Sequence, residues 1–210
     1  MNVKSILEQC GLTEQHFEFI AEAIPAGYAA LRSIVDNTPM LSLFAPGSQR
    51  LGHLRNVAVQ HALQLKAGTT DLFYTKDAWN AARNHMFLQL QCGQVVLTAH
   101  YCGKKGNTGV KKAIVRGELN QRNYDLFEKE KKEPDANPFT GTAYAQILHG
   151  GISDPVMAAI SIPNRDQTSY ILPPFILPVR TPQASKVEEV KDMIADTMKK
   201  KQKSKQDQVA

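Results

Sequence analysis

The hydrophobic period of the sequence changes near Gly68, and this change restricts the chain to folds that combine helices with a sheet. Within 51–66, apolar side chains recur every three or four residues, which is the period of a helix. The members of this stripe are Leu51, Leu54, Val57, Ala58, His61 and Leu65. The same stripe leaves Arg55 outside the apolar face. After Gly68, apolar and polar residues alternate as they do in strands. The sequence therefore predicts an α+β protein whose helical N-terminal portion packs on a mostly antiparallel sheet.

The first 67 residues are predicted to be mainly helical. Thr13 is a suitable N-cap for a helix that starts near Glu14. The segment 25–27, Pro-Ala-Gly, is expected to interrupt that helix, because proline lacks the N–H that a helix interior requires. A second helix is predicted over 28–35, and an irregular connection over 40–52.

The remaining residues are predicted to form the sheet, together with a few short helices. The predicted strands are 72–74, 86–91, 94–101, 112–119, 158–162 and 170–177. The last of these belongs at an edge of the sheet, because Pro173 and Pro174 cannot donate to a ladder. The predicted helices are 122–132, 143–148 and an amphipathic C-terminal helix that Ser185 caps.

We expect residues 1–198 to form a single α+β domain, with 1–67 mainly helical and 70–180 mainly strands. Hydrophobic residues make up 42% of the chain and charged residues 21%, so a sizeable core can be buried. The lysine-rich tail at 199–210 is expected to be disordered.

The cysteine content and the hydropathy favour the cytoplasm. Three cysteines are too few for a disulfide framework, which indicates a reducing compartment. The uncharged stretches of the sequence are too short or too polar to span a membrane. Since residues 1–4 lack an apolar run, we also expect no secretory signal.

The strands 86–91 and 94–101 are predicted to pair as a hairpin whose central turn residues are 92–93. In that register Leu88 lies opposite Leu97, and one face of the hairpin is wholly apolar.

The other face of this hairpin carries a candidate metal or catalytic site. The register places His85 opposite His100, with Cys102 diagonal to His85. Two imidazoles and a thiolate can bind zinc, and one histidine can act as a general base. The alternative is an ordinary histidine pair on the solvent face of a sheet.

The loop after the hairpin combines glycine with lysine. Residues 103–112 contain three glycines at intervals of three and four lysines. Such glycines leave backbone N–H groups accessible, and lysines attract phosphates. The cations predicted to contact nucleic acid are Lys104, Lys105, Lys111, Lys112, Arg116 and Arg122. The alternative is an exposed hairpin loop without a ligand.

The net charge of +5 is unevenly distributed along the chain. Residues 1–40 carry −3, residues 100–132 carry +5, and residues 186–210 carry +2. A basic centre and a basic tail favour nucleic acid or an acidic protein as the partner. The alternative is a solvated surface with a solubilising tail.

His149 marks a third candidate site. It follows the predicted helix 143–148, where a histidine caps the C-terminal carbonyls favourably. Alternatively, His149 and Asp154 form an acid–base pair on a loop that contains two glycines. No GxSxG nucleophile motif occurs beside them.

Three functions follow from these features, and we place nucleic-acid association first. In this function the glycine–lysine loop and the basic tail bind DNA or RNA. We expect little sequence specificity, because the sequence contains no helix-turn-helix, zinc-finger or RRM motif. The second is a non-catalytic protein-interaction or assembly subunit. The apolar, proline-rich stretch 170–178 favours this function. The third is a hydrolase or nuclease built on one of the two histidine sites. The sequence is compatible with a homo-oligomer and indicates no particular cofactor.

Overall fold

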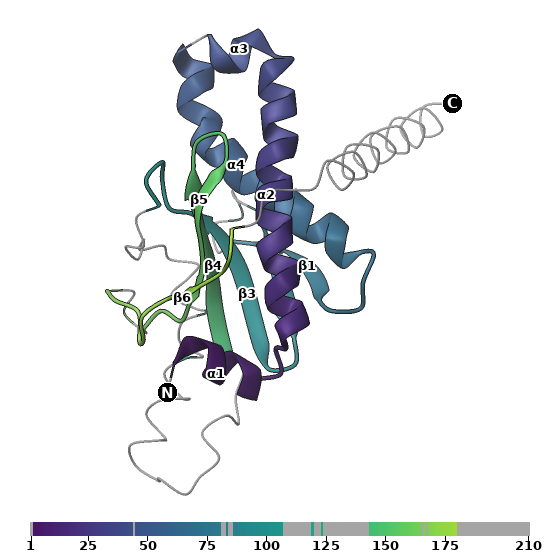
Figure 1. Cartoon of the computed structure of the whole chain (residues 1–210), viewed down its shortest axis with the longest axis vertical. Coiled ribbons are helices and arrows are strands. Elements are labelled where there is room, and N and C mark those ends of the chain that lie inside the picture. The colour runs from purple at the N-terminus through teal and green to yellow at the C-terminus, as the bar shows by residue number, and fades with distance from the viewer. Residues whose placement is uncertain are drawn as a thin grey trace, which may run out of the picture.

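The protein is described by a computed structural model that covers residues 2–43, 45–80, 83, 86–106, 119, 123, 143–164, 166 and 168–179. Its helices are α1 (Val3–Gln9), α2 (Glu14–Asp36), α3 (Pro39–Ser42) and α4 (Ala45–Ala67). Its strands are β1 (Tyr74–Trp79), β2 (Met86–Cys92), β3 (Val95–Tyr101), β4 (Ala143–Gly151), β5 (Pro155–Ser161) and β6 (Phe175–Ile176). The predicted α+β class is confirmed (Figure 1).

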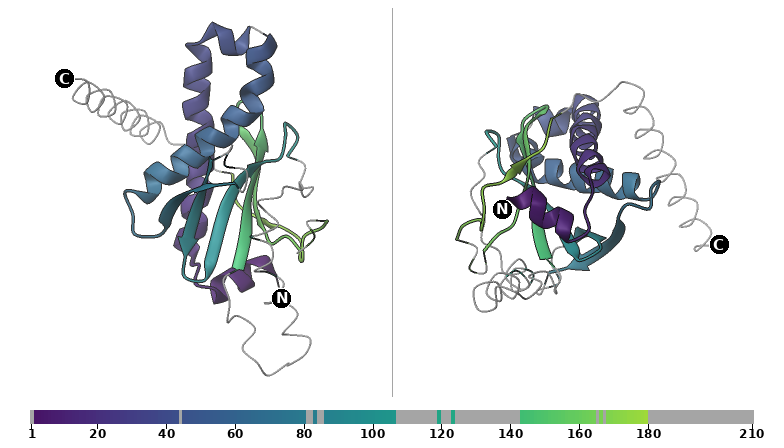
Figure 2. Two further views of the ribbon diagram at one scale, coloured as in Figure 1. Left: turned by 180° about the vertical axis from the view of Figure 1, so that it is seen from behind. Right: turned by 60° about the horizontal axis from the view of Figure 1, so that its bottom comes forward.

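The described strands form one mixed sheet in the order β1-β2-β3-β4-β5-β6. Neighbouring strands are antiparallel except β3 and β4, which are parallel, so the prediction of a mostly antiparallel sheet is confirmed. α2 and α4 lie together on one face of this sheet (Figure 2). Because β3 and β4 run in the same direction, their carboxyl ends meet at one edge of the sheet.

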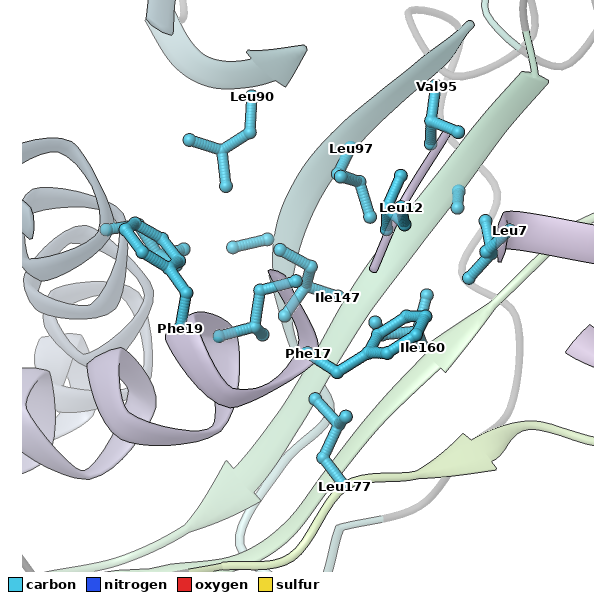
Figure 3. Packing of buried hydrophobic residues seen from close by; sticks show 14 of the residues in the cluster. Leu7, Leu12, Phe17, Phe19, Leu90, Val95, Leu97, Ile147, Ile160 and Leu177 are labelled. Carbon is cyan, nitrogen blue, oxygen red and sulfur yellow. The ribbon is translucent and has the colours of Figure 1, made fainter. Parts of the chain in front are cut away.

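The main core fills the space between the helices and the sheet. Its large side chains come from α1, α2, α4 and four strands, and Figure 3 shows several of them converging between the two layers. They include Leu7, Phe17, Phe19, Leu90, Leu97, Ile147 and Ile160. Burial of such apolar area is the main force that holds the helices on the sheet.

α2 is one continuous helix, so the predicted interruption at 25–27 is wrong. Thr13 caps it as predicted, and its backbone N–H donates to Nδ1 of His16 at 3.0 Å. The helix continues past Pro25 because the surrounding turns are buried, and this packing outweighs one lost hydrogen bond. Gly27 allows the close packing, since a Cβ there would lie 2.7 Å from the Cα of Val59 in α4.

α4 differs from the prediction in both its start and its buried face. It begins at Ala45, inside the stretch 40–52 that is predicted to be irregular, and α3 occupies 39–42. Val57, a member of the predicted apolar stripe, is 45% exposed. The buried residues of α4 are instead Arg55, Val59, Ala62, Leu63 and Ala67.

A row of amide side chains explains the orientation of α4. Asn56, Gln60 and Gln64 follow one another at intervals of one helical turn, so they share a flank of the helix. They form hydrogen bonds to β4, β2 and β1 respectively. These polar contacts turn the face that carries Arg55 and Val59 toward the core.

The β2–β3 hairpin forms as predicted, but its register is shifted. Leu97 pairs with Leu90 rather than with Leu88, and the turn residues are 93–94 rather than 92–93. Gly93 adopts a φ of 53°, a conformation that glycine enters most easily. The described ladder ends at the Leu90–Leu97 pair, and the N–H of Leu88 donates to Oε1 of Gln60 at 2.8 Å. The two strands therefore separate where the prediction keeps them paired.

The segment 143–148, predicted to be helical, forms most of β4. Every residue of this strand is buried, so both of its faces are covered, and β3 and β5 flank it in the sheet. A strand that is buried on both faces shows no alternation of polar and apolar residues, which removes the usual signal.

The other predicted strands are confirmed in part. The strand at 158–162 corresponds to β5, and the one at 72–74 overlaps only the start of β1. The strand at 170–177 is reduced to β6 after Pro173 and Pro174, and it lies at the edge of the described sheet as predicted.

Several predicted elements lie outside the described residues. They are the strand at 112–119, the helix at 122–132, the C-terminal helix after Ser185 and the tail at 199–210. Two residues of this region are described, Leu119 and Asn123, and both are helical. Among the helices that are described, none combines the length and the hydropathy needed to cross a membrane.

We predict that Gly27→Ala lowers the free energy of unfolding by about 1–3 kcal/mol. The added Cβ would meet backbone atoms of Ala58 and Val59 at 2.7–2.9 Å, and these cannot move without separating α2 from α4. Urea denaturation measures the change. The control is Gly68→Ala, where the nearest atom lies at 3.4 Å, and equal stabilities of the two variants would contradict the prediction.

Candidate functional site

The candidate site lies at the edge where β3 and β4 end side by side. β3 is followed by the turn Gly103–Gly106, and β4 by the short loop 152–154 that leads into β5. The carboxyl ends of parallel strands are the place where open α/β sheets most often bind ligands.

The turn Gly103–Gly106 is seated directly on the end of β4. A Cβ on Gly150 would lie 2.5 Å from the Cα of Gly106 and 2.8 Å from the carbonyl oxygen of Gly103. The N–H of Gly151 donates to that same carbonyl at 3.2 Å. Because the turn is held at both of its glycines, the exposed Lys104 and Lys105 between them project from a defined position.

Arg55 of α4 reaches the same edge from the helical layer. Its Nε donates to the carbonyl oxygen of Ile152 at 2.7 Å, and its guanidinium carbon lies 5.6 Å from the ring centre of Tyr101. Tyr101 in turn donates its hydroxyl to the carbonyl of Gly151 at 2.9 Å. These contacts tie the guanidinium to both strands of the parallel pair.

Arg55 is buried without a carboxylate. It is only 6% exposed, and within the described part of the chain no acidic side chain pairs with it. Nε is the only one of its nitrogens with a hydrogen-bond acceptor among these residues. Burial weakens the hydration of a charge, so an anion bound at this position would stabilise the guanidinium.

Other basic side chains of the structure do have carboxylates. Lys4 pairs with Glu14 and Lys66 pairs with Glu22, each at 2.6 Å. These lysines are more exposed than Arg55 and need a counter-ion less. Among the described residues, Arg55 is therefore the buried cation that forms no ion pair.

A neutral polar network lies beneath this edge. His149 of β4 is fully buried, and its Nε2 donates to Oδ1 of Asn56 at 3.2 Å. Its Nδ1 accepts from the hydroxyl of Tyr28 at 3.1 Å. Burial lowers the pKa of His149 to about 3 and raises the pKa of Tyr28, so both groups are neutral at pH 7.

The structure does not bring His149 and Asp154 together as an acid–base pair. His149 lies in a strand rather than at a helix end, and its ring bonds to Tyr28 and Asn56. Asp154 is exposed and accepts from Nη1 of Arg32 at 3.0 Å. Each residue therefore has partners other than the one the sequence suggests.

The histidine–cysteine site is described only in part. His85 lies outside the described residues, and the register that places it opposite His100 is shifted by two. Nε2 of His100 contacts Oγ1 of Thr98 at 2.6 Å, whereas the thiol of Cys102 contacts the backbone oxygen of His100 at 3.7 Å. Among the residues that the structure covers, no three metal-binding side chains converge.

The predicted nucleic-acid contacts are described at Lys104 and Lys105. The other four, Lys111, Lys112, Arg116 and Arg122, lie outside the described residues. Sequence reasoning missed Arg55, although its spacing of four residues from Val59 and eight from Leu63 was a usable signal for a shared helix face.

Comparisons with known proteins add no relative. No protein-family model matches the chain, and neither a curated protein nor a solved structure does so.

We predict that Arg55→Leu keeps or raises the free energy of unfolding in phosphate-free buffer, by up to about 4 kcal/mol. The leucine retains apolar packing, and the buried charge without a carboxylate disappears. Urea denaturation measures the effect, with Arg32→Leu as the control at an exposed ion pair. A loss of more than about 2 kcal/mol in Arg55→Leu would show that the guanidinium serves stability.

We predict that acid destabilises the fold through His149. Its folded pKa of about 3 lies below the unfolded value near 6.5, so the unfolded chain binds the proton first. The contribution of neutral His149 is complete above pH 6.5 and is lost as the pH falls toward 3. Between pH 6.5 and 5 the loss amounts to about 2 kcal/mol.

Urea denaturation of the wild type and of His149→Gln over this pH range tests the assignment. The variant lacks the titrating group, so its stability should change less with pH. Equal pH dependence in the two proteins would contradict the role of His149.

Proposed function

We propose that the protein associates with nucleic acid by binding phosphate at the edge where β3 and β4 end. The observation that carries this proposal is Arg55, a buried arginine that pairs with no carboxylate among the described residues and lies beside a glycine-bounded turn with two lysines. Guanidinium groups bind phosphate oxygens through paired hydrogen bonds, and lysines add charge attraction.

The charges around Arg55 support an anionic ligand. Lys104 and Lys105 are exposed on the turn, and Arg32 lies beside the loop 152–154. Asp154 is the acidic side chain described next to them, and Arg32 holds it in an ion pair. A positive field at one edge attracts polyanions over a distance of about 10 Å at 0.1 M salt.

The proposed contacts are to the backbone of the nucleic acid rather than to its bases. Lysines on a tight turn reach phosphates, and such contacts position a protein without reading a sequence. Residues 107–122 add four further cations in the sequence after this turn. We therefore propose binding of DNA or RNA with little sequence specificity.

The proposed location is the cytoplasm, where nucleic acid is accessible. The three cysteines, Cys10, Cys92 and Cys102, form no disulfide bond in the structure. Cysteines that do not form disulfides are typical of a reducing compartment and support this location.

We predict that replacing both Lys104 and Lys105 with alanine weakens binding to a DNA duplex and reduces its salt dependence. If both contact phosphates, the slope of log K against log salt falls by about 1.8 in magnitude. Fluorescence anisotropy at several salt concentrations measures it. Lys76→Ala, which removes an exposed charge from β1, is the control and should leave the slope unchanged.

The wild type decides the proposal itself. No binding to duplex or single-stranded DNA or RNA at low salt would refute it. An unchanged slope in the double variant would show that the turn is not the contact.

A further inference from the structure

We infer that Arg55 recognises the terminal phosphate of a polynucleotide rather than a phosphodiester within the strand. This inference rests on the proposed function and names the chemical group that the site selects. It follows from the difference in accessibility between Arg55 and the lysines of the turn.

The burial of Arg55 limits what can approach it. Only 6% of the residue is exposed, whereas Lys104 and Lys105 are open to solvent. A phosphodiester inside a strand carries a sugar on each side and presents two free oxygens. A terminal phosphate is joined to one sugar only and presents three oxygens at its tip. With a sugar on one side only, the terminal group can approach a recessed guanidinium more closely than a phosphodiester within the strand can.

The orientation of Arg55 is already set for such a ligand. Its Nε donates to the carbonyl of Ile152, and its guanidinium carbon lies 5.6 Å from the ring centre of Tyr101. The terminal nitrogens have no acceptor among the described residues, so they remain for paired hydrogen bonds to phosphate. Because the side chain is held in place, less conformational entropy is lost on binding.

The charge of the site also favours a terminal phosphate. A phosphomonoester carries about −1.5 to −2 at pH 7, against −1 for a phosphodiester. The polar network beneath this edge, which we call the floor of the site, is neutral because His149 and Tyr28 are uncharged. Among the described residues no buried carboxylate competes for Arg55, so the cations of the edge can act on the higher charge of the ligand.

The lysines of the turn indicate that the ligand is a polymer. Their position on the exposed side of Gly103–Gly106 suits the phosphates that follow the terminal one. A mononucleotide lacks these phosphates, so it should bind more weakly than the end of a strand.

The test compares one single-stranded DNA oligonucleotide in three forms, with a 5′-phosphate, with a 3′-phosphate and with neither. Fluorescence anisotropy with the full chain is expected to show about tenfold or greater tighter binding of one phosphorylated form. Adenosine 5′-monophosphate, titrated as a competitor, should bind more weakly than that oligonucleotide. Affinities within about twofold for all three forms would overturn the inference while leaving nucleic-acid binding intact.

Variants assign the preference to Arg55. Arg55→Lys keeps the charge but loses the paired donors, and Arg55→Leu loses both, so each should abolish the preference for the phosphorylated form. Lys76→Ala should retain it. If the preference for the phosphorylated form survives in Arg55→Lys and Arg55→Leu, the assignment to Arg55 is overturned. If the mononucleotide binds as tightly as the oligonucleotide, the inference that the ligand is a polymer is overturned. Loss of binding to every form in the wild type would instead refute the proposed function.

Discussion

The parallel pairing of β3 with β4 is the constraint on which the rest of the candidate site depends. It brings the turn after Tyr101 and the loop after Gly151 to the same edge of the sheet. The closeness of the two ends requires glycine at 150, because Gly106 occupies the space that a Cβ would need. An antiparallel β4 would place His149 and the lysines of the turn at opposite ends of the sheet, and no common site would form.

α4 couples the neutral floor of the site to its charge. Asn56, which bonds to His149, is the residue after Arg55, which bonds to the loop that follows β4. The same helical turn therefore holds the buried imidazole and places the guanidinium above the strand ends. The neutrality of His149 matters here, since an imidazolium would repel Arg55 and a carboxylate in its place would neutralise it.

The fold could be predicted where the sequence carries a local signal. Thr13 marks the start of α2, and the change of period near Gly68 separates helices from strands. The misses at α2 and β4 have a common cause, because tertiary packing overrides the local rule at both of them. α2 continues past Pro25 since its neighbouring turns are buried, and β4 lacks alternation since both of its faces are covered. The hairpin register depends on which two residues form the turn. Gly93 is the first of these two residues in the structure, whereas the prediction makes it the second.

Arg55 shows why the candidate site was harder to predict than the fold. Charge clusters along the chain identify Lys104 and Lys105, because neighbouring lysines share one surface turn. Arg55 has no basic neighbour in the helix sequence, and the most apolar stripe of that helix predicts that Arg55 faces away from the core. The structure buries it at the same face as Val59 and Leu63, against that rule. A buried guanidinium that forms no ion pair with the described residues is an exception to the local rule of the kind expected at functional sites. Arg55, which pairs with no carboxylate among the described residues, is therefore a stronger indication of function than the exposed lysines of the turn.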